Sequence, residues 1–221
     1  AAWIGYDDFE ERRTLAHSAI DRATSILGPD SPRILVAQGQ YLYRFERDFV
    51  GALEKQTKAL AAIPGDVNLL LDVANTQRRL GLWDESIANM LLAADLDPAS
   101  PNAPGSAAST MFIHGEYDRL EKFLPAVLER FPYDTDLASI HAMLPLRAQG
   151  DTKTARRRLD DVRPNAGIEY VQASIALPWY ERDFVAAIEI WDQPEVKALT
   201  STDGWVGWGE VYQAMAWLEL G

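Results

Sequence analysis

The stretch from Val67 to Ser100, VNLLLDVANTQRRLGLWDESIANMLLAADLDPAS, decides the fold of this chain. Apolar residues recur in it every three or four positions, both before and after Gly81, and this spacing is typical of amphipathic helices. Gly81 falls where the chain must turn, and Pro98 falls where a second helix must stop. The stretch therefore predicts two short antiparallel helices.

The same turn glycine and helix-ending proline recur along most of the chain. Prolines stand 34 residues apart at Pro64, Pro98 and Pro132, and turn glycines stand 34 and 35 residues apart at Gly81, Gly115 and Gly150. The pentapeptide ERDFV also occurs twice, at 46–50 and 181–185, and we expect each copy to begin a helix. Two independent markers with one period indicate a helical repeat protein.

A period of 34 with helix, glycine turn, helix and proline resembles the tetratricopeptide repeat. The residues of the opening stretch that carry the resemblance are Leu70, Val73 and Ala74 in the first helix, Trp83 after the turn, and Ser86, Met90 and Ala93 in the second helix. Ser86 replaces the usual alanine, and Gln77 replaces the usual aromatic residue. The resemblance implies an all-α, right-handed superhelical solenoid of antiparallel helix pairs, with about 11 to 12 helices.

The repeat divides the chain into five units and two incomplete ends. We expect a single solenoid domain over 1–221, with a half-unit at 6–31, units near 32–66, 67–100, 101–134, 135–165 and 167–192, and a terminal helix at 209–221. The unit at 32–66 has one extra residue near Phe45, and PNAPGS at the start of the unit at 101–134 predicts a short first helix. In the unit at 135–165 the sequence RPNAG arrives early, so the regular spacing of the terminal proline is lost. Incomplete ends predict a fragment of a longer protein, or ends that a partner covers.

Composition narrows the classes of partner. Thirty-three acidic and 21 basic residues give a formal charge of −12, which disfavours nucleic acid and anionic membrane surfaces. No apolar run approaches the ~18 residues that a membrane span needs, so no membrane insertion is predicted. Cysteine is absent, which excludes disulfides and thiolate chemistry and fits a reducing compartment. We expect a cytoplasmic protein.

The sequence contains no constellation of residues typical of an enzyme. His17, His114 and His141 fall in different units without a second ligand at helical spacing, and no nucleotide-binding or nucleophile motif occurs. We therefore predict no catalytic residue, no cofactor and no metal site, and an enzyme on a helical scaffold is only a remote alternative.

The resemblance does imply a binding surface, because first helices line the concave groove of tetratricopeptide arrays. The outward positions of these helices are Gln40, Tyr43, Arg44, Asn68, Asn75, Arg78, Arg79, Phe112, Arg147, Trp179 and Tyr180. Asparagine amides can bond an extended backbone and arginines bind carboxylates through two donors, so an acidic or carboxylate-bearing peptide or protein is the expected partner. The alternative is that these are ordinary solvated helix residues.

Chaperone-binding members of the tetratricopeptide family have a carboxylate clamp, which needs lysine, asparagine and arginine at fixed positions. This sequence lacks the clamp. The matching places hold Val36, Gln40, Asp72, Asn102 and Ser106.

Residues 43–98 also resemble the repeat arrays found behind output domains of bacterial signalling proteins, notably adenylate cyclases and serine/threonine kinases. This resemblance implies a non-catalytic protein-interaction scaffold in a signalling or regulatory protein. The alternative function is self-association, with two chains forming a homodimer through the solenoid ends or through an interface at Trp205 and Trp208.

Overall fold

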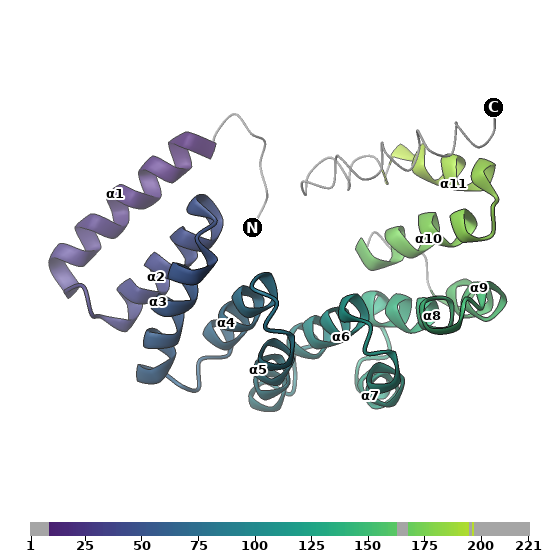
Figure 1. Ribbon diagram of the computed structural model, residues 1–221, viewed down its shortest axis with the longest axis horizontal. Coiled ribbons are helices and arrows are strands. Elements are labelled where there is room, and N and C mark those ends of the chain that lie inside the picture. The colour runs from purple at the N-terminus through teal and green to yellow at the C-terminus, as the bar shows by residue number, and fades with distance from the viewer. Residues whose placement is uncertain (1–8, 163–167, 195, 197–221) are drawn as a thin grey trace. The chain divides into compact units, whose positions relative to one another are not determined.

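The computed structural model describes residues 9–162, 168–194 and 196, and these form eleven α-helices and one π-helical segment (Figure 1). The elements are α1 Phe9–Leu27, α2 Pro32–Tyr41, η2 Leu42–Glu46, α3 Phe49–Ala62, α4 Val67–Arg79, α5 Trp83–Leu96, α6 Asn102–His114, α7 Tyr117–Arg130, α8 Thr135–Gln149, α9 Thr152–Asp160, α10 Ile168–Tyr180 and α11 Phe184–Trp191. Short turns join the members of each helix pair. None of these helices is long and apolar enough to cross a membrane. The predicted all-α class with consecutive helix pairs is confirmed.

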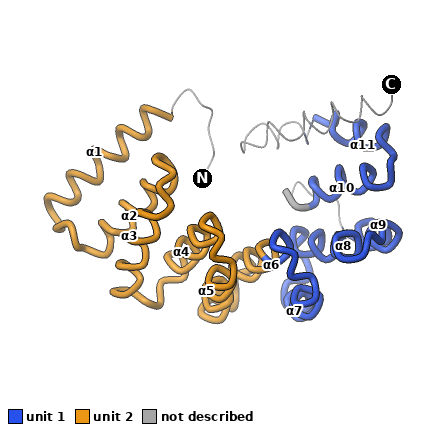
Figure 2. Tube along the Cα trace, in the orientation of Figure 1, with its two compact units in different colours: residues 1–4, 111–221 blue, residues 5–110 orange. Residues whose placement is uncertain are grey.

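Two compact units divide the described residues (Figure 2). The first, here called the N-terminal unit, ends at Thr110, and the C-terminal unit begins at Met111. The boundary falls within α6. The first helices of the pairs are α2 with η2, α4, α6, α8 and α10, and the second helices are α3, α5, α7, α9 and α11.

Packing in the N-terminal unit runs from each helix to the next, from α1 to α5. One apolar cluster joins Leu35 of α2, Ala59 of α3, and Leu69 and Val73 of α4. The six packing residues predicted in α4 and α5 are all buried, namely Leu70, Val73, Ala74, Ser86, Met90 and Ala93. Nearest-neighbour contacts between helix pairs therefore stabilise this unit.

Hydrogen bonds explain both departures from the repeat pattern. The Ser86 hydroxyl donates to the carbonyl oxygen of Ala74 at 2.7 Å, so a fully buried polar group is satisfied across the helix pair. The side chain of Asn89 donates to Gln77 Oε1 at 2.8 Å. A polar contact therefore joins α4 and α5 where the repeat usually has an aromatic residue.

Each helix pair turns through one residue in the left-handed region. Gly81, Gly115 and Gly150 take φ values of 76°, 89° and 71°, and in the two ERDFV copies arginine takes the same place, with φ 52° at Arg47 and 61° at Arg182. This conformation costs a side-chain-bearing residue ~1–2 kcal/mol, which explains why glycine is common here.

The aspartate of each ERDFV copy caps the following helix. Asp48 accepts from the backbone N–H of Gly51 at 2.9 Å, and Asp183 accepts from that of Ala186 at 3.1 Å. The prediction that each copy begins a helix is confirmed, since α3 starts at Phe49 and α11 at Phe184.

The extra residue expected near Phe45 lies in the π-helical segment η2. A single π-helical turn accommodates one inserted residue without breaking a helix, and such turns are frequent at functional sites. Tyr43 and Arg44 both lie in this segment.

The prediction of a short first helix at PNAPGS is wrong, because α6 has 13 residues, as many as α4. Pro104 falls in the first turn, where backbone N–H groups have no partner inside the helix in any case. The Asn102 N–H donates to the Ser100 hydroxyl at 3.3 Å, and the Gly105 N–H donates to the carbonyl of Pro101 at 2.8 Å. Local bonds thus start the helix despite its composition.

In the C-terminal unit, α8 packs against α7, α9 and α10, and α10 packs against α11. The main cluster includes Met143 and Leu146 of α8, Leu159 of α9 and Leu177 of α10. The second helices shorten, with 9 residues in α9 and 8 in α11 against 14 in each of α3, α5 and α7. The early end of α9 agrees with the early RPNAG sequence.

Candidate functional site

Polar side chains of the first helices meet on one side of the N-terminal unit. Residues three, four or seven apart share a helix face, which groups Arg33, Gln40 and Arg44 on α2 and η2, and Asn68, Asp72, Asn75 and Arg79 on α4. Three hydrogen bonds cross between neighbouring first helices, from Gln40 Nε2 to Asp72 Oδ2 at 2.9 Å, from Arg79 Nε to the Tyr43 hydroxyl at 3.2 Å, and from Arg78 Nη1 to the Thr110 hydroxyl at 3.3 Å. We call this surface, with its seven stripe residues and Tyr43 and Arg78, the first-helix face.

The first-helix face is locally basic in an acidic chain. Arg33, Arg44 and Arg79 are exposed, and within the described residues neither Arg44 nor Arg79 is paired with a carboxylate. Asp72, the acidic member of the face, accepts a hydrogen bond from Gln40. Two exposed guanidinium groups on this side therefore offer donors to an external acceptor.

Glu46, at the end of η2, is held by α1. Arg13 Nη2 lies 2.9 Å from Glu46 Oε1, and its hydrogen bond, with help from Tyr41, holds the pKa of Glu46 below its usual range. The Glu46 carboxylate, two residues after Arg44, is thus already paired with Arg13 of α1.

Tyr43 gives this part of the face a defined geometry. Its ring packs edge-on against Phe49 with 5.3 Å between centroids, while its hydroxyl accepts the bond from Arg79. The tyrosine, held at both ends, engages the Nε–H of Arg79, and the guanidinium has further N–H donors on its two Nη atoms. The structure brings together the predicted residues Gln40, Tyr43 and Arg79.

Asn68 and Asn75 lie on the same stripe of α4, with Asn68 exposed in its first turn and Asn75 partly exposed. Arg33 belongs to the face but was not among the sequence-predicted residues. Its position seven residues before Gln40 is the signal that could have found it.

The predicted groove residues of the C-terminal unit pack within that unit. The Arg147 guanidinium lies over the Phe112 ring at 5.6 Å, Phe112 packs against Tyr117 at 6.2 Å, and Trp179 packs against Phe184 at 4.9 Å. Burial lowers the pKa of Arg147, but nearby Tyr117 and Tyr180 outweigh it, so the pKa is raised above the usual value. Tyr180 remains exposed. The predicted interface residues Trp205 and Trp208 lie outside the described residues.

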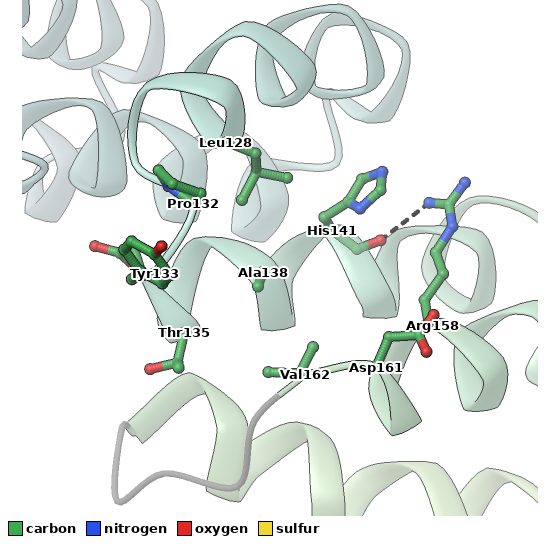
Figure 3. A pocket seen from close by; sticks show the side chains of 10 residues that line it. Leu128, Pro132, Tyr133, Thr135, Ala138, His141, Arg158, Asp161 and Val162 are labelled. Atoms are coloured by element: carbon green, nitrogen blue, oxygen red, sulfur yellow. Dashed lines mark hydrogen bonds between the residues drawn. The ribbon is translucent and has the colours of Figure 1, made fainter.

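The sequence did not predict a hollow of about 560 Å³ in the C-terminal unit (Figure 3). Its apolar part comes from Leu128 at the end of α7, Ala138 of α8 and Val162 after α9. A full-length second helix would continue past Asp160, so the short α9 accounts for the space. The early RPNAG of this unit was the signal in the sequence.

Polar groups on one side of the hollow are already engaged. Arg158 Nη1 donates to the carbonyl of His141 at 3.1 Å, drawn as a dashed line in Figure 3, and Arg158 Nη2 lies 3.7 Å from Glu121 Oε1. Burial and the nearby Arg158 charge lower the pKa of the His141 imidazole. Within the described residues, no group of three His, Asp or Glu is placed to hold a metal ion. The first-helix face, with its exposed arginines Arg33, Arg44 and Arg79, is the stronger candidate site.

Comparison with known proteins identifies the fold. No protein-family model matches the sequence, and no curated protein matches it. Among solved structures, a tetratricopeptide repeat protein from Parabacteroides merdae matches with a TM-score of 0.68 and 16% identity, over 96% of this chain and 80% of that one. A chain of the APC/C hetero-tetramer Cut9–Hcn1 matches with a TM-score of 0.67 and 16% identity, over 94% of this chain and 40% of that one.

YrrB, described as a TPR protein with an unusual peptide-binding site, matches with a TM-score of 0.52 and 12% identity, over 83% of this chain and 93% of its own. At these identities the matches show the fold alone. The chain has the tetratricopeptide repeat fold that the sequence predicts.

Proposed function

We propose that this chain is a protein-interaction scaffold that binds an acidic segment of a partner protein on the first-helix face of the N-terminal unit. The observation that carries the proposal is the pair of exposed arginines, Arg44 and Arg79, which no described carboxylate neutralises. Guanidinium groups bind carboxylates through two parallel hydrogen bonds, and a chain with a formal charge of −12 disfavours an acidic ligand away from local basic patches. Such a patch therefore favours one docking position.

The structural neighbours support this proposal by analogy. The neighbour YrrB is described as having a peptide-binding site, and another neighbour is a chain of the hetero-tetramer Cut9–Hcn1. We propose a recruiting role without catalysis. A place in a bacterial signalling protein of the cyclase or kinase type is a further proposal, which rests on the sequence of residues 43–98.

The test is a selection from a displayed peptide library against the immobilised 221-residue chain. We expect the selected peptides to be acidic and to lose most binding to the double variant Arg44→Ala, Arg79→Ala. The matched control is Lys122→Ala, Lys153→Ala, which removes the same charge from exposed places on the second helices α7 and α9. Peptides that bind both double variants equally well would remove the proposal, and unchanged circular dichroism would show that each variant is folded.

Self-association is the second candidate, and α1 is the observation that favours it. Helix α1 has no buried residue, and Leu15, Ile26 and Leu27 are 61%, 80% and 51% exposed. Such a surface is expected where another helix packs. Light scattering over a dilution series should show a dimer that the double variant Leu15→Glu, Ile26→Glu dissociates, and a monomer at every concentration would exclude this candidate.

A further inference from the structure

The hollow of the C-terminal unit can be matched residue by residue with the N-terminal unit. Helices α4 and α8 begin alike, because Asp66 accepts from the Leu69 N–H at 3.0 Å and Asp134 accepts from the Leu137 N–H at 2.9 Å. The two capping aspartates stand two periods of 34 residues apart. Residues at equal distances from these caps therefore occupy the same place in their helix pairs.

Two side chains of α8 are smaller or more polar than their counterparts in α4. Leu70 and Val73 of α4 are 1% and 3% exposed, whereas the residues at the same places in α8 are Ala138 and His141, which are only partly buried. Both of these residues line the hollow. The start of α8 thus has less apolar bulk than the start of α4, and it carries an imidazole where α4 carries a valine.

The short second helix adds to the space, since α9 ends after 9 residues and α5 after 14. A space inside helix packing loses dispersion contacts and therefore lowers stability. The hollow of about 560 Å³ lies within the ~300–1,000 Å³ that is usual for ligand sites. Three changes that open the same place at the expense of packing favour a site for a group from another molecule.

The lining suits an occupant with an apolar body and a polar tip. Its apolar part comes from Leu128, Ala138 and Val162 (Figure 3). The His141 ring nitrogens have no hydrogen-bond partner among the described residues, and the lowered pKa leaves the ring uncharged at neutral pH. An aliphatic occupant would cover these nitrogens without a partner, which is unfavourable. A phenol hydroxyl donates or accepts, so tyrosine fits either tautomer of the ring.

The charges of the lining favour an uncharged occupant. Asp134 and Asp161 belong to the lining, and the chain has a formal charge of −12, so an anionic occupant is disfavoured. Arg158 also belongs to the lining, and its charge contributes to the lowered pKa of His141, so a cation beside the imidazole is disfavoured as well. A phenol ring, with a pKa of about 10, is neutral and meets both conditions.

We propose that the hollow between α7, α8 and α9 receives a tyrosine side chain of a partner protein, with its ring against Leu128, Ala138 and Val162 and its hydroxyl bonded to the His141 imidazole. A protein occupant fits because in the N-terminal unit a protein segment, the longer helix α5, packs along α4. The inference does not depend on the first-helix face, and it adds an uncharged contact to the charged one proposed there.

The experiment follows the NMR signal of the His141 ring in the full 221-residue chain. The chain has three histidines, so the double variant His17→Gln, His114→Gln, at two exposed places, leaves His141 as the one imidazole. The probes are N-acetyl-tyrosine amide and N-acetyl-phenylalanine amide, which are uncharged and differ by one hydroxyl. We expect both to shift the signal saturably, and the tyrosine probe to bind about fivefold tighter because it alone forms the hydrogen bond.

A substitution in the same background closes the hollow. Ala138→Leu introduces the residue that α4 has at this place, so we expect the helical circular dichroism to persist and the affinity for the tyrosine probe to fall by about tenfold or more. The matched control is Ala126→Leu, which adds the same side chain at an exposed place on α7 outside the lining and should leave binding unchanged.

A short glycine–serine peptide with one central tyrosine tests the source of the side chain. It should bind at least as tightly as the tyrosine probe, because a partner segment must reach the hollow with its backbone attached. Binding that is weaker by more than about tenfold would show a site for small molecules and would exclude a partner protein.

The remaining outcomes are equally decisive. A His141 signal that neither probe shifts overturns the inference, and so does equal affinity for the two probes, since the hydroxyl contact would then be absent. Binding that persists in Ala138→Leu places the probe outside the hollow and has the same consequence. The comparison of the two probes needs no substitution in the hollow, so it decides the inference even if Ala138→Leu does not fold.

Discussion

The two units carry different side chains at the same place of the repeat. The residues three positions before the left-handed turn are Arg44 and Arg78 in the N-terminal unit, and Phe112, Arg147 and Trp179 in the C-terminal unit. The arginines of the N-terminal unit are exposed or bonded to a hydroxyl. In the C-terminal unit two of the three residues at this position are aromatic, Phe112 and Trp179, and the Phe112 ring faces the guanidinium of Arg147.

This difference shows that a position in the repeat does not determine its role. Arg147 has a cation–π contact with Phe112 and interacts with Tyr117 and Tyr180, so it already has partners within its own unit. An arginine beside a tyrosine hydroxyl uses one donor and keeps its charge exposed. We therefore expect the outward positions to support binding in the N-terminal unit and stability in the C-terminal unit.

The largest expected effect that tests this comparison is on stability. Phe112 packs against the main cluster of the C-terminal unit and against Tyr117. Phe112→Ala should lower the free energy of unfolding by about 2–3 kcal/mol, below the full-burial figure because the ring is half-buried. Arg44→Ala, at the same repeat position, should change it by less than ~0.5 kcal/mol. Urea denaturation measures both, and similar values for the two would contradict the comparison.

A smaller effect is expected at Arg147. Arg147→Gln removes the cation over Phe112 and the contacts with the tyrosines, which together should cost about 1 kcal/mol. Arg79→Gln loses one bond to an exposed tyrosine hydroxyl and should leave the melting temperature nearly unchanged. If Arg79→Gln proved the more destabilising, its guanidinium would be structural and unsuited to the proposed ligand contact.

Much of the fold could be predicted from sequence because it depends on local signals of fixed spacing. Each second helix among α3, α5 and α7 ends two residues before the proline that predicts its end, and each turn glycine has positive φ. Apolar spacing likewise identified buried residues such as Leu70 and Met90. These features need only the chemistry of a few neighbouring residues.

Features that depend on partners distant in sequence could not be predicted in this way. The sequence groups Phe112 and Arg147 with Arg44 as outward residues, but their stacking needs side chains from three helices to converge. In the sequence, Arg47 and Arg182 also look like ordinary charged residues. Only their positive φ values show that they take the place of the turn glycine. The repeat period determines the position of a residue within its helix pair. The side chains that it contacts on other helices determine whether it contributes to stability or stays open to a ligand.

The arginine turns offer a smaller and more direct comparison of the units. Arg47→Gly relieves the left-handed strain and should raise the free energy of unfolding by up to ~1 kcal/mol, after the greater freedom of glycine in the unfolded chain is subtracted. Arg182→Gly should gain less, because Arg182 also lies over the Phe184 ring at 5.6 Å. Thermal unfolding of both variants measures the difference, and an equal gain would show that the cation–π contact adds nothing.

The smallest effect concerns the helix cap at Asp151 in the C-terminal unit. Its carboxylate accepts from the backbone N–H of Thr154 at 3.0 Å, and this bond, with the Thr154 hydroxyl, holds the pKa of Asp151 below its usual value. Because the folded pKa is lowered, the carboxylate's contribution to stability is complete above the unfolded pKa of about 3.9 and is lost as pH falls through the folded value.

Asp151→Asn keeps a capping oxygen but cannot titrate, so it isolates the contribution of the charge. The variant should melt slightly below the natural chain at pH 6, and the two melting temperatures should converge as pH falls below the unfolded pKa and through the lowered folded pKa of Asp151. A gap that stays constant over this range would mean that the charge of Asp151 contributes nothing and that hydrogen-bond geometry alone makes the cap. In that case the capping aspartates of both units, including Asp48 and Asp183, should tolerate asparagine equally well.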